Sequence, residues 1–396
     1  MTSVLSTTRP RSRSLLAISF ISFILLSFPH GMLGIAWPSI RDTFGMPLEA
    51  LGILLFAATT GHIATSFSGG LLVGRLGVGV FLLLSVCANA LGLLGYVLAP
   101  AWWVLILAAA MSGVGGGAMD MGLNAFFASN YSARMMNWLH ASFGLGVTLG
   151  PIAMTWLLDR GSSWRMGYLL ALAAMLVLAI VYIRTLAWWP KQAPALKADN
   201  QADAPPPTRL LSMSVVWLSL AVFFFVSGME ATAGNWAFTL FTEGRGETIV
   251  AAGQWVSAYW ASFTAGRVLF GLLGERLAPV SVLRGTMLLA MLGAGLLWWH
   301  PTDGVSYLGL VLFGLALAPM FPLLILETPR RVGKKYADQV IGFQIGVAGL
   351  GLAALPALAG VLADRISLEI VPPFVVIGIV ILIIFHETVL RRGATS

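Results

Sequence analysis

The chain has 396 residues, of which 58% are apolar and only 10% are Asp, Glu, Lys or Arg. Soluble domains carry about 25% charged residues, so a water-soluble fold is excluded and most of the surface must face lipid. The net charge is +7, but the basic residues fall in short gaps between apolar runs, so we expect no nucleic-acid partner. The single cysteine, Cys87, excludes an intrachain disulfide and a cysteine metal cluster.

Twelve apolar runs are long enough to cross a bilayer, which takes about 20 helical residues. In chain order they span residues 15–40, 47–73, 78–99, 101–129, 135–158, 164–189, 213–241, 249–274, 279–299, 305–327, 338–362 and 368–389. The first run follows Arg9, Arg11 and Arg13 and is too long for a cleaved signal peptide, so we expect it to be retained. The sequence therefore predicts an all-α membrane protein with twelve transmembrane helices.

The longest polar gap, residues 191–211, predicts a linker between two halves. Its Ala, Asp and Gln residues and three consecutive prolines, Pro205 to Pro207, cannot bury a face or continue a helix. We therefore expect an N-terminal six-helix bundle over residues 1–190 and a C-terminal six-helix bundle over residues 212–396.

The two halves also repeat each other. The sequence GLLVGRL at 70–76 returns as GLLGERL at 271–277, and Pro151 with Asp159-Arg160 returns as Pro356 with Asp364-Arg365. Both matches fall at equivalent helix ends. Parallel six-helix repeats are typical of transporters whose site lies between the halves near the bilayer midplane.

The distribution of positive charge predicts the orientation. Lys and Arg gather in every second loop, on the side that carries both termini and the linker. Positive loops face the cytoplasm. We therefore expect a multi-pass protein of a bacterial-type inner (plasma) membrane, surrounded by lipid, monomeric and with both termini and the linker in the cytoplasm.

Over essentially its whole length the chain resembles the major facilitator superfamily. The run from Gly70 to Arg75 is similar to the superfamily's Gly-x-x-x-Asp-Arg loop motif, with Gly74 where an acid is usual. The second copy, Gly271 to Arg276, keeps an acid as Glu275. The resemblance implies the fold that the apolar runs predict, but it leaves the cargo open.

Several short motifs lie within the apolar runs: Asp120-Met-Gly-Leu-Asn124, Asn137-Trp-Leu-His140, Gly228-Met-Glu230 with Trp236, and Ala318 to Pro322. The first two are similar to the acid-x-x-x-Asn and Asn-x-x-Gln signatures of the fucose permease-like sugar:proton symporters, and the others also resemble motifs of that group within the superfamily. The acid that this group can carry in its first helix is absent from Gly34 to Pro38. The resemblance implies secondary active symport of a sugar or polyol-like small solute with protons, by alternating access and without a cofactor.

Carboxylates inside apolar helices are candidate functional groups, because an ionisable residue at bilayer depth costs several kcal/mol (about 2.5 or more) unless it is paired or solvated. Asp120 and Asn124 lie one helical turn apart and share a face, which suits the hydroxyls of a sugar, although a packing hydrogen bond is the alternative. Glu230 lies near the middle of the seventh run. We expect it to carry the proton, against the alternative of a structural acid paired with Arg or His.

Two histidines join Asp120 and Glu230 as candidates for proton coupling. His30 lies in the middle of the first run, and His140 is placed so that contact with Asp120 is geometrically feasible. An interhelical hydrogen bond is the alternative role for each.

Further polar residues in the apolar runs are candidates for binding the substrate. Beside Asp120 and Asn124 they are Asn137, Asn235, Trp236, Gln339 and Gln344. Amide side chains can form hydrogen bonds with the hydroxyl groups of a substrate, but they can also form hydrogen bonds between helices. For the two glutamines, the second role stays open as an alternative.

Other classes of protein are less compatible with the sequence. His-Glu-x-x-His, Gly-x-Ser-x-Gly and P-loop motifs are absent, so we expect no enzyme and no metal site. The glycine-rich run from Gly113 to Ala118 lies inside an apolar segment and predicts close helix packing, not a nucleotide-binding turn. Proton-coupled efflux of amphipathic compounds or of another small metabolite stays open as an alternative, as does a sensor on a transporter scaffold.

Overall fold

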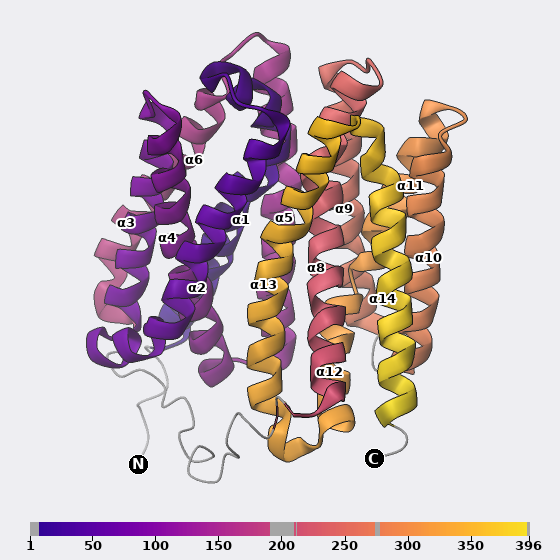
Figure 1. Cartoon of the computed structure of the whole chain (residues 1–396). Coiled ribbons are helices and arrows are strands. Elements are labelled where there is room, and N and C mark those ends of the chain that lie inside the picture. Colours follow the sequence, from indigo (N-terminus) through magenta and orange to yellow (C-terminus); the bar gives the residue numbers. More distant parts are fainter. Residues whose placement is uncertain (1–7, 191–209, 211, 274–277, 394–396) are drawn as a thin grey trace, which may run out of the picture. The chain divides into compact units, whose positions relative to one another are not determined.

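The computed structural model describes residues 8–190, 210, 212–273 and 278–393, and every regular element in these ranges is helical. The long helices (Figure 1) are α1 (Thr8–Phe44), α2 (Leu51–Leu76), α3 (Val78–Leu98), α4 (Trp102–Asn130), α5 (Ala133–Asp159), α6 (Arg165–Thr185), α8 (Ser214–Thr239), α9 (Ile249–Leu273), α10 (Pro279–Trp299), α11 (Asp303–Leu317), α12 (Met320–Val332), α13 (Lys334–Arg365) and α14 (Val371–Gly393). Short helical turns at η1 (Leu48–Ala50), η2 (Leu186–Trp188), η4 (Leu240–Gly244) and η6 (Leu368–Ile370) extend or connect them.

Each predicted span falls on one of these helices, which confirms the all-α membrane fold. The tenth span, residues 305–327, is the exception in detail, because it is divided into α11 and α12. Pro319 lies at the break; it has no N–H to continue the backbone ladder of α11. Within the described residues, eleven helical segments are long and apolar enough to cross a membrane. The long helix outside this set is α9, which carries Gln254 and Arg267.

The outer surface of the helices is strongly apolar. Leu98, Leu272 and Leu288 are exposed by 64%, 69% and 65%, and many more large apolar side chains are exposed to a similar degree. A soluble protein rarely exposes contiguous apolar patches of this kind. Lipid is the environment that solvates this surface favourably.

The helices group into two compact units. Unit 1 comprises Met1–Met32 and Ala57–Lys197, and unit 2 comprises Leu33–Phe56 and Ala198–Ser396. The end of α1 and the start of α2 thus belong with the C-terminal helices. The predicted linker, residues 191–211, lies outside the described residues except for Leu210, and the division into bundles over 1–190 and 212–396 stays a prediction.

Glycines bring the helices of unit 1 into backbone contact. A Cβ atom on Gly115 of α4 would lie 2.2 Å from the backbone nitrogen of Asn89 on α3. On another face of α4, a Cβ atom on Gly113 would lie 2.0 Å from the Ala58 carbonyl oxygen on α2. Only glycine permits such approach. The close packing predicted for the glycine-rich run is therefore confirmed.

In unit 2, α8 packs along α13 and α14 (Figure 1). The segment 33–56 lies against η4 and α13, because Arg41 forms an ion pair with Glu243 at 2.5 Å, and the backbone N–H of Leu48 donates to Asp364 at 3.1 Å. A Cβ atom on Gly34 would lie 2.8 Å from the Gly234 carbonyl oxygen. This part of α1 therefore packs directly on the backbone of α8.

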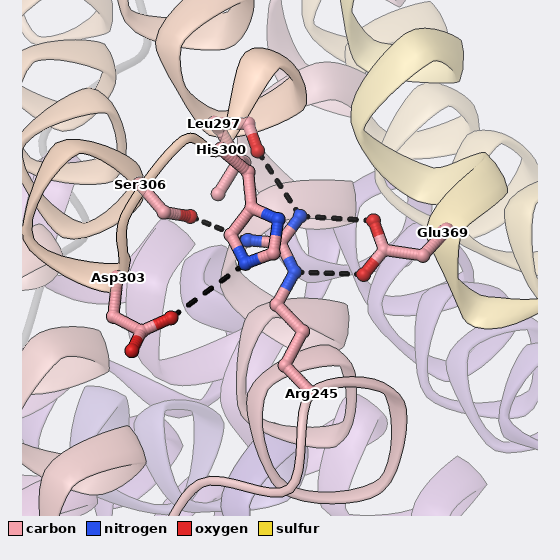
Figure 2. Close-up of polar contacts among 6 residues, drawn as sticks. All are labelled: Arg245, Leu297, His300, Asp303, Ser306 and Glu369. Atoms are coloured by element: carbon pink, nitrogen blue, oxygen red, sulfur yellow. Dashed lines mark hydrogen bonds and ion pairs between the residues drawn. The ribbon is translucent and has the colours of Figure 1, made fainter.

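Arg245, in the loop between α8 and α9, forms hydrogen bonds with three other segments of unit 2 (Figure 2). Its Nε and Nη2 donate to the two carboxylate oxygens of Glu369 in η6, at 2.7 and 2.9 Å. The same guanidinium donates to Ser306 at the start of α11 (2.5 Å) and to the Leu297 carbonyl oxygen near the end of α10 (3.1 Å). The Arg245 side chain is 3% exposed, so these bonds replace its hydration.

Candidate functional site

In unit 1, α4 places a carboxylate and an amide side by side. The Nδ2 of Asn124 donates to the Asp120 carboxylate and to the Asp120 carbonyl oxygen, both at 2.9 Å. Both residues are half-buried. The second carboxylate oxygen and the amide oxygen of the pair keep acceptor capacity that a hydroxyl group can use.

His140 on α5 lies close enough to Asp120 for its charge to attract the carboxylate. Its ring packs edge-on against Phe23 of α1, with the ring centroids 5.9 Å apart. The structure thus brings together the three polar side chains Asp120, Asn124 and His140. Asn137 is exposed near the start of α5, about one turn before His140.

His30 on α1 is exposed, and its Nδ1 donates to the Leu26 carbonyl oxygen at 3.0 Å. This bond leaves Nε2 as the acceptor of the neutral ring. The ring lies 6.4 Å from that of Phe143 on α5. A second histidine, His62 on α2, is near enough to repel His30 when both are charged. The sequence analysis missed His62, although a histidine within an apolar helix is itself a signal.

In unit 2, Glu230 lies on α8 and Arg267 on the neighbouring helix α9. The two charges attract each other, but among the described residues their side chains form no direct ion pair. The Arg267 guanidinium lies 4.4 Å from the ring centroid of Phe263, and its buried Nε has no hydrogen-bond partner within the described residues. Tyr259 donates to the Glu230 carbonyl oxygen at 2.9 Å, which ties α9 to α8 at this level.

The residues that follow Glu230 along α8 are bonded to the protein itself. Asn235 is half-buried and donates to the Ala231 carbonyl oxygen at 2.8 Å. Trp236 is fully buried, and its indole N–H donates to the Pro356 carbonyl oxygen of α13 at 2.9 Å. The Trp236 indole nitrogen therefore connects two helices of unit 2.

The two glutamines of α13 differ. Gln344 is fully buried; its amide accepts from Thr328 of α12 at 3.0 Å and donates to Ser219 of α8 at 2.5 Å. This arrangement connects three helices. Gln339 is half-buried, and its buried amide oxygen has no hydrogen-bond partner in the described part of the chain. Of the two, Gln339 has the acceptor that is free for a ligand.

The residues brought together suit the binding of a polar solute and the exchange of a proton. In each unit a half-buried carboxylate within a long helix lies near a group that can be cationic: Asp120 near His140, and Glu230 near Arg267. Within the described residues, no group of three or more His, Cys, Asp or Glu side chains could hold a metal ion.

Comparison with known proteins gives consistent matches over most of the chain. The family model described as Major Facilitator Superfamily matches residues 19–351. The glucose/mannose transporter of Bacillus subtilis is 23% identical over 350 residues, which cover 85% of this chain and 85% of the relative. The fosmidomycin resistance protein of Escherichia coli is 23% identical and covers 92% of this chain and 90% of its own length. The crystal structure of the E. coli fucose:proton symporter superposes with a TM-score of 0.64 at 16% identity, over 95% of this chain and 98% of that one.

Proposed function

The chain belongs to the Major Facilitator Superfamily and is a multi-pass membrane transporter, not an enzyme, and on this premise we propose that it carries a sugar or polyol-like solute together with protons. Transport would proceed by alternating access of the solute to the two sides of the membrane. The relative that transports glucose and mannose supports a sugar as the cargo. The fold shared with a fucose:proton symporter is compatible with this mechanism.

The observation that carries the proposal is the placement of Glu230 near Arg267 without a direct ion pair. Arg267 stabilises the ionised carboxylate, whereas burial favours its protonated form. A modest change in the distance between the two side chains would therefore load or release a proton. This is the property that a coupling group needs in a carrier that alternates between two states.

Asp120 and Asn124 are assigned to the solute. A carboxylate held by an amide at 2.9 Å presents several acceptors and one donor to neighbouring hydroxyls. We assign His140 and His30 to proton coupling beside them. Asn137, Asn235 and Gln339 complete the assignment as polar contacts for the solute.

Trp236 and Gln344 are assigned a supporting role at the same site. Their polar atoms are already bonded to neighbouring helices, so they would hold α8 and α13 in position for the residues that touch the solute. The sequence predicts that both residues bind the substrate directly. Direct binding stays a prediction beside the supporting role proposed here.

The same proposal includes the setting of the protein. It would act as a monomer in a bacterial-type inner (plasma) membrane, with the linker and both termini in the cytoplasm, because the basic loops lie on that side.

The test is transport by protein reconstituted into vesicles, with radiolabelled monosaccharides and polyols and an imposed proton gradient. Glu230→Gln mimics the protonated acid permanently, so it should abolish accumulation against a gradient while keeping exchange of labelled solute across the membrane. Asp120→Asn should lose both activities. Asp303→Asn, an exposed acid at the start of α11, is the matched control. Accumulation by Glu230→Gln at the wild-type level would refute the coupling assignment.

Proton-coupled efflux of an amphipathic compound or another small metabolite is the second candidate. The relative named for fosmidomycin resistance favours it. If the vesicles show no sugar uptake but extrude a drug when a proton gradient is imposed, efflux would replace symport as the proposed function.

A further inference from the structure

Helix α1 belongs partly to unit 1 and partly to unit 2, although it is one continuous helix. A Cβ atom on Gly31 would lie 2.4 Å from the Val147 carbonyl oxygen of α5, in unit 1. Almost one helical turn later, a Cβ atom on Gly34 would lie 2.8 Å from the Gly234 carbonyl oxygen of α8, in unit 2. Within this turn, α1 therefore passes from backbone contact with one unit to backbone contact with the other.

Two polar contacts fix the segment 33–56 to the C-terminal helices of unit 2. Arg41, near the end of α1, forms its ion pair with Glu243 of η4. The backbone N–H of Leu48, the first residue of η1, donates to the carboxylate of Asp364 near the end of α13. The first N–H groups of a helical turn have no partner within the turn, so the Asp364 carboxylate supplies one.

The ion pair of Arg41 differs from that of Arg245, which lies two residues beyond Glu243. The Arg245 side chain is 3% exposed and binds Glu369 through two hydrogen bonds. The side chains of Arg41 and Glu243 are 23% and 30% exposed, and one hydrogen bond joins them in the described part of the chain. Water can replace such a bond at little cost. Glu243 also lies in a π-helical turn, a geometry that is frequent at functional sites.

The segment 33–56 is the part of the N-terminal half of the sequence that packs with the C-terminal helices. It precedes the predicted linker by more than a hundred residues, yet its contacts place it in unit 2. A carrier that alternates between two states has to break and re-form contacts between its two halves. For this segment, the polar contacts are those of Arg41 and Leu48.

We propose that Arg41, Glu243 and Asp364 form a latch that holds the segment 33–56 on unit 2 in one state of the transport cycle and releases it in the other. The proposal rests on transport by alternating access, but not on the identity of the solute or of the coupling ion. Release exchanges one partly exposed ion pair and one hydrogen bond for hydration. The latch therefore biases the equilibrium between the two states without blocking it.

The experiment measures how fast a buried cysteine in the segment reacts with a water-soluble maleimide, in the purified full chain in detergent and without solute. Ala50 lies in η1, which packs on α13, and is 2% exposed. Ala50→Cys in a Cys87→Ser background therefore reports release of the segment. Ala290→Cys, at a fully buried position of α10, is the control for unfolding. Ala50→Cys should react much faster than Ala290→Cys, because release is a local event.

Arg41→Glu should raise the reaction rate at Ala50→Cys at least about threefold, because repulsion from Glu243 replaces attraction. Adding Glu243→Arg to Arg41→Glu restores the attraction and should return the rate to that of the wild-type latch. Arg41→Gln serves in place of Arg41→Glu should that variant fail to fold. Arg284→Gln removes an ion pair of unit 2 outside the latch and should leave the rate unchanged.

Asp364→Ala removes the acceptor of the Leu48 N–H and should also raise the rate at Ala50→Cys. Equal rates at Ala50→Cys and Ala290→Cys, or an unchanged rate in the Arg41 variants, would overturn the latch. Absence of sugar uptake in the vesicle experiment would instead refute the proposed solute, and it would leave these reaction rates as they are.

Discussion

Replacing Arg245 with alanine should destabilise unit 2 more than the loss of any exposed arginine. The guanidinium makes four hydrogen bonds to Glu369, Ser306 and the Leu297 carbonyl oxygen, and it is 3% exposed. These bonds connect the loop after α8 with the end of α10, the start of α11 and η6. Without them, the Leu297 carbonyl and the Ser306 hydroxyl lose their donor.

The size of the effect follows from burial. A hydrogen bond to a charged group contributes about 1.5–3 kcal/mol, and removing one partner of a buried pair costs about 3–5 kcal/mol. The Glu369 side chain is 45% exposed, so water can solvate it after the substitution. We therefore expect the lower end, about 3 kcal/mol, for Arg245→Ala. Arg245→Lys should lose less stability, because the positive charge remains and only the bidentate guanidinium contact is lost.

The assay is thermal unfolding in detergent, followed by tryptophan fluorescence. Arg284→Ala is the matched control, because Arg284 binds Glu387 with the same bidentate geometry but is 54% exposed. Exposed pairs contribute little to stability, so Tm should fall clearly in Arg245→Ala and barely in Arg284→Ala. Equal shifts of Tm in the two variants would refute the argument that burial decides the contribution of these pairs.

Three further outcomes can be measured. Gly115→Ala should lower Tm or expression, because its Cβ atom would lie 2.2 Å from a backbone nitrogen of α3, whereas Gly295→Ala, with open space around the added atom, should be neutral. Gln344→Leu should destabilise the chain, because it removes two buried hydrogen bonds, one to Thr328 and one to Ser219; unchanged Tm would contradict this. Protease added to inside-out vesicles should cut between residues 191 and 209, and cutting from the outer face alone would overturn the predicted orientation.

The sequence predicted the helices well because polar residues, glycines and prolines lie at many of the helix ends. The span predicted at 279–299 coincides with α10, which begins at a proline. Pro319 was noticed as part of a motif, but the break it makes between α11 and α12 was not expected. A proline in a transmembrane helix can be accommodated when neighbouring groups satisfy the freed carbonyl, so its effect depends on packing that the sequence does not specify.

The candidate site was predictable only within single helices. Asp120 and Asn124 meet because helical geometry places residues four apart on one face. The proximity of Glu230 to Arg267, and the bonds of Gln344 to Ser219, depend on how neighbouring helices are rotated. Apolar residues surround most of these membrane helices, so hydrophobic periodicity does not fix that rotation.

Four arginines of unit 2 differ in whether their guanidinium groups are hydrogen-bonded within the protein, and this difference distinguishes a structural role from a functional one. The Arg245 side chain is buried, and its guanidinium is hydrogen-bonded to Glu369. The Arg284 side chain is exposed, and its guanidinium is hydrogen-bonded to Glu387. Neither arginine therefore leaves a charge uncompensated. Arg331 is buried and Arg267 is half-buried, and each has a buried Nε that is unbonded within the described residues. Such a charge needs compensation by an opposite charge or a bound group. For Arg267 that compensation is the attraction of Glu230, which is why the pair suits the proposed coupling role.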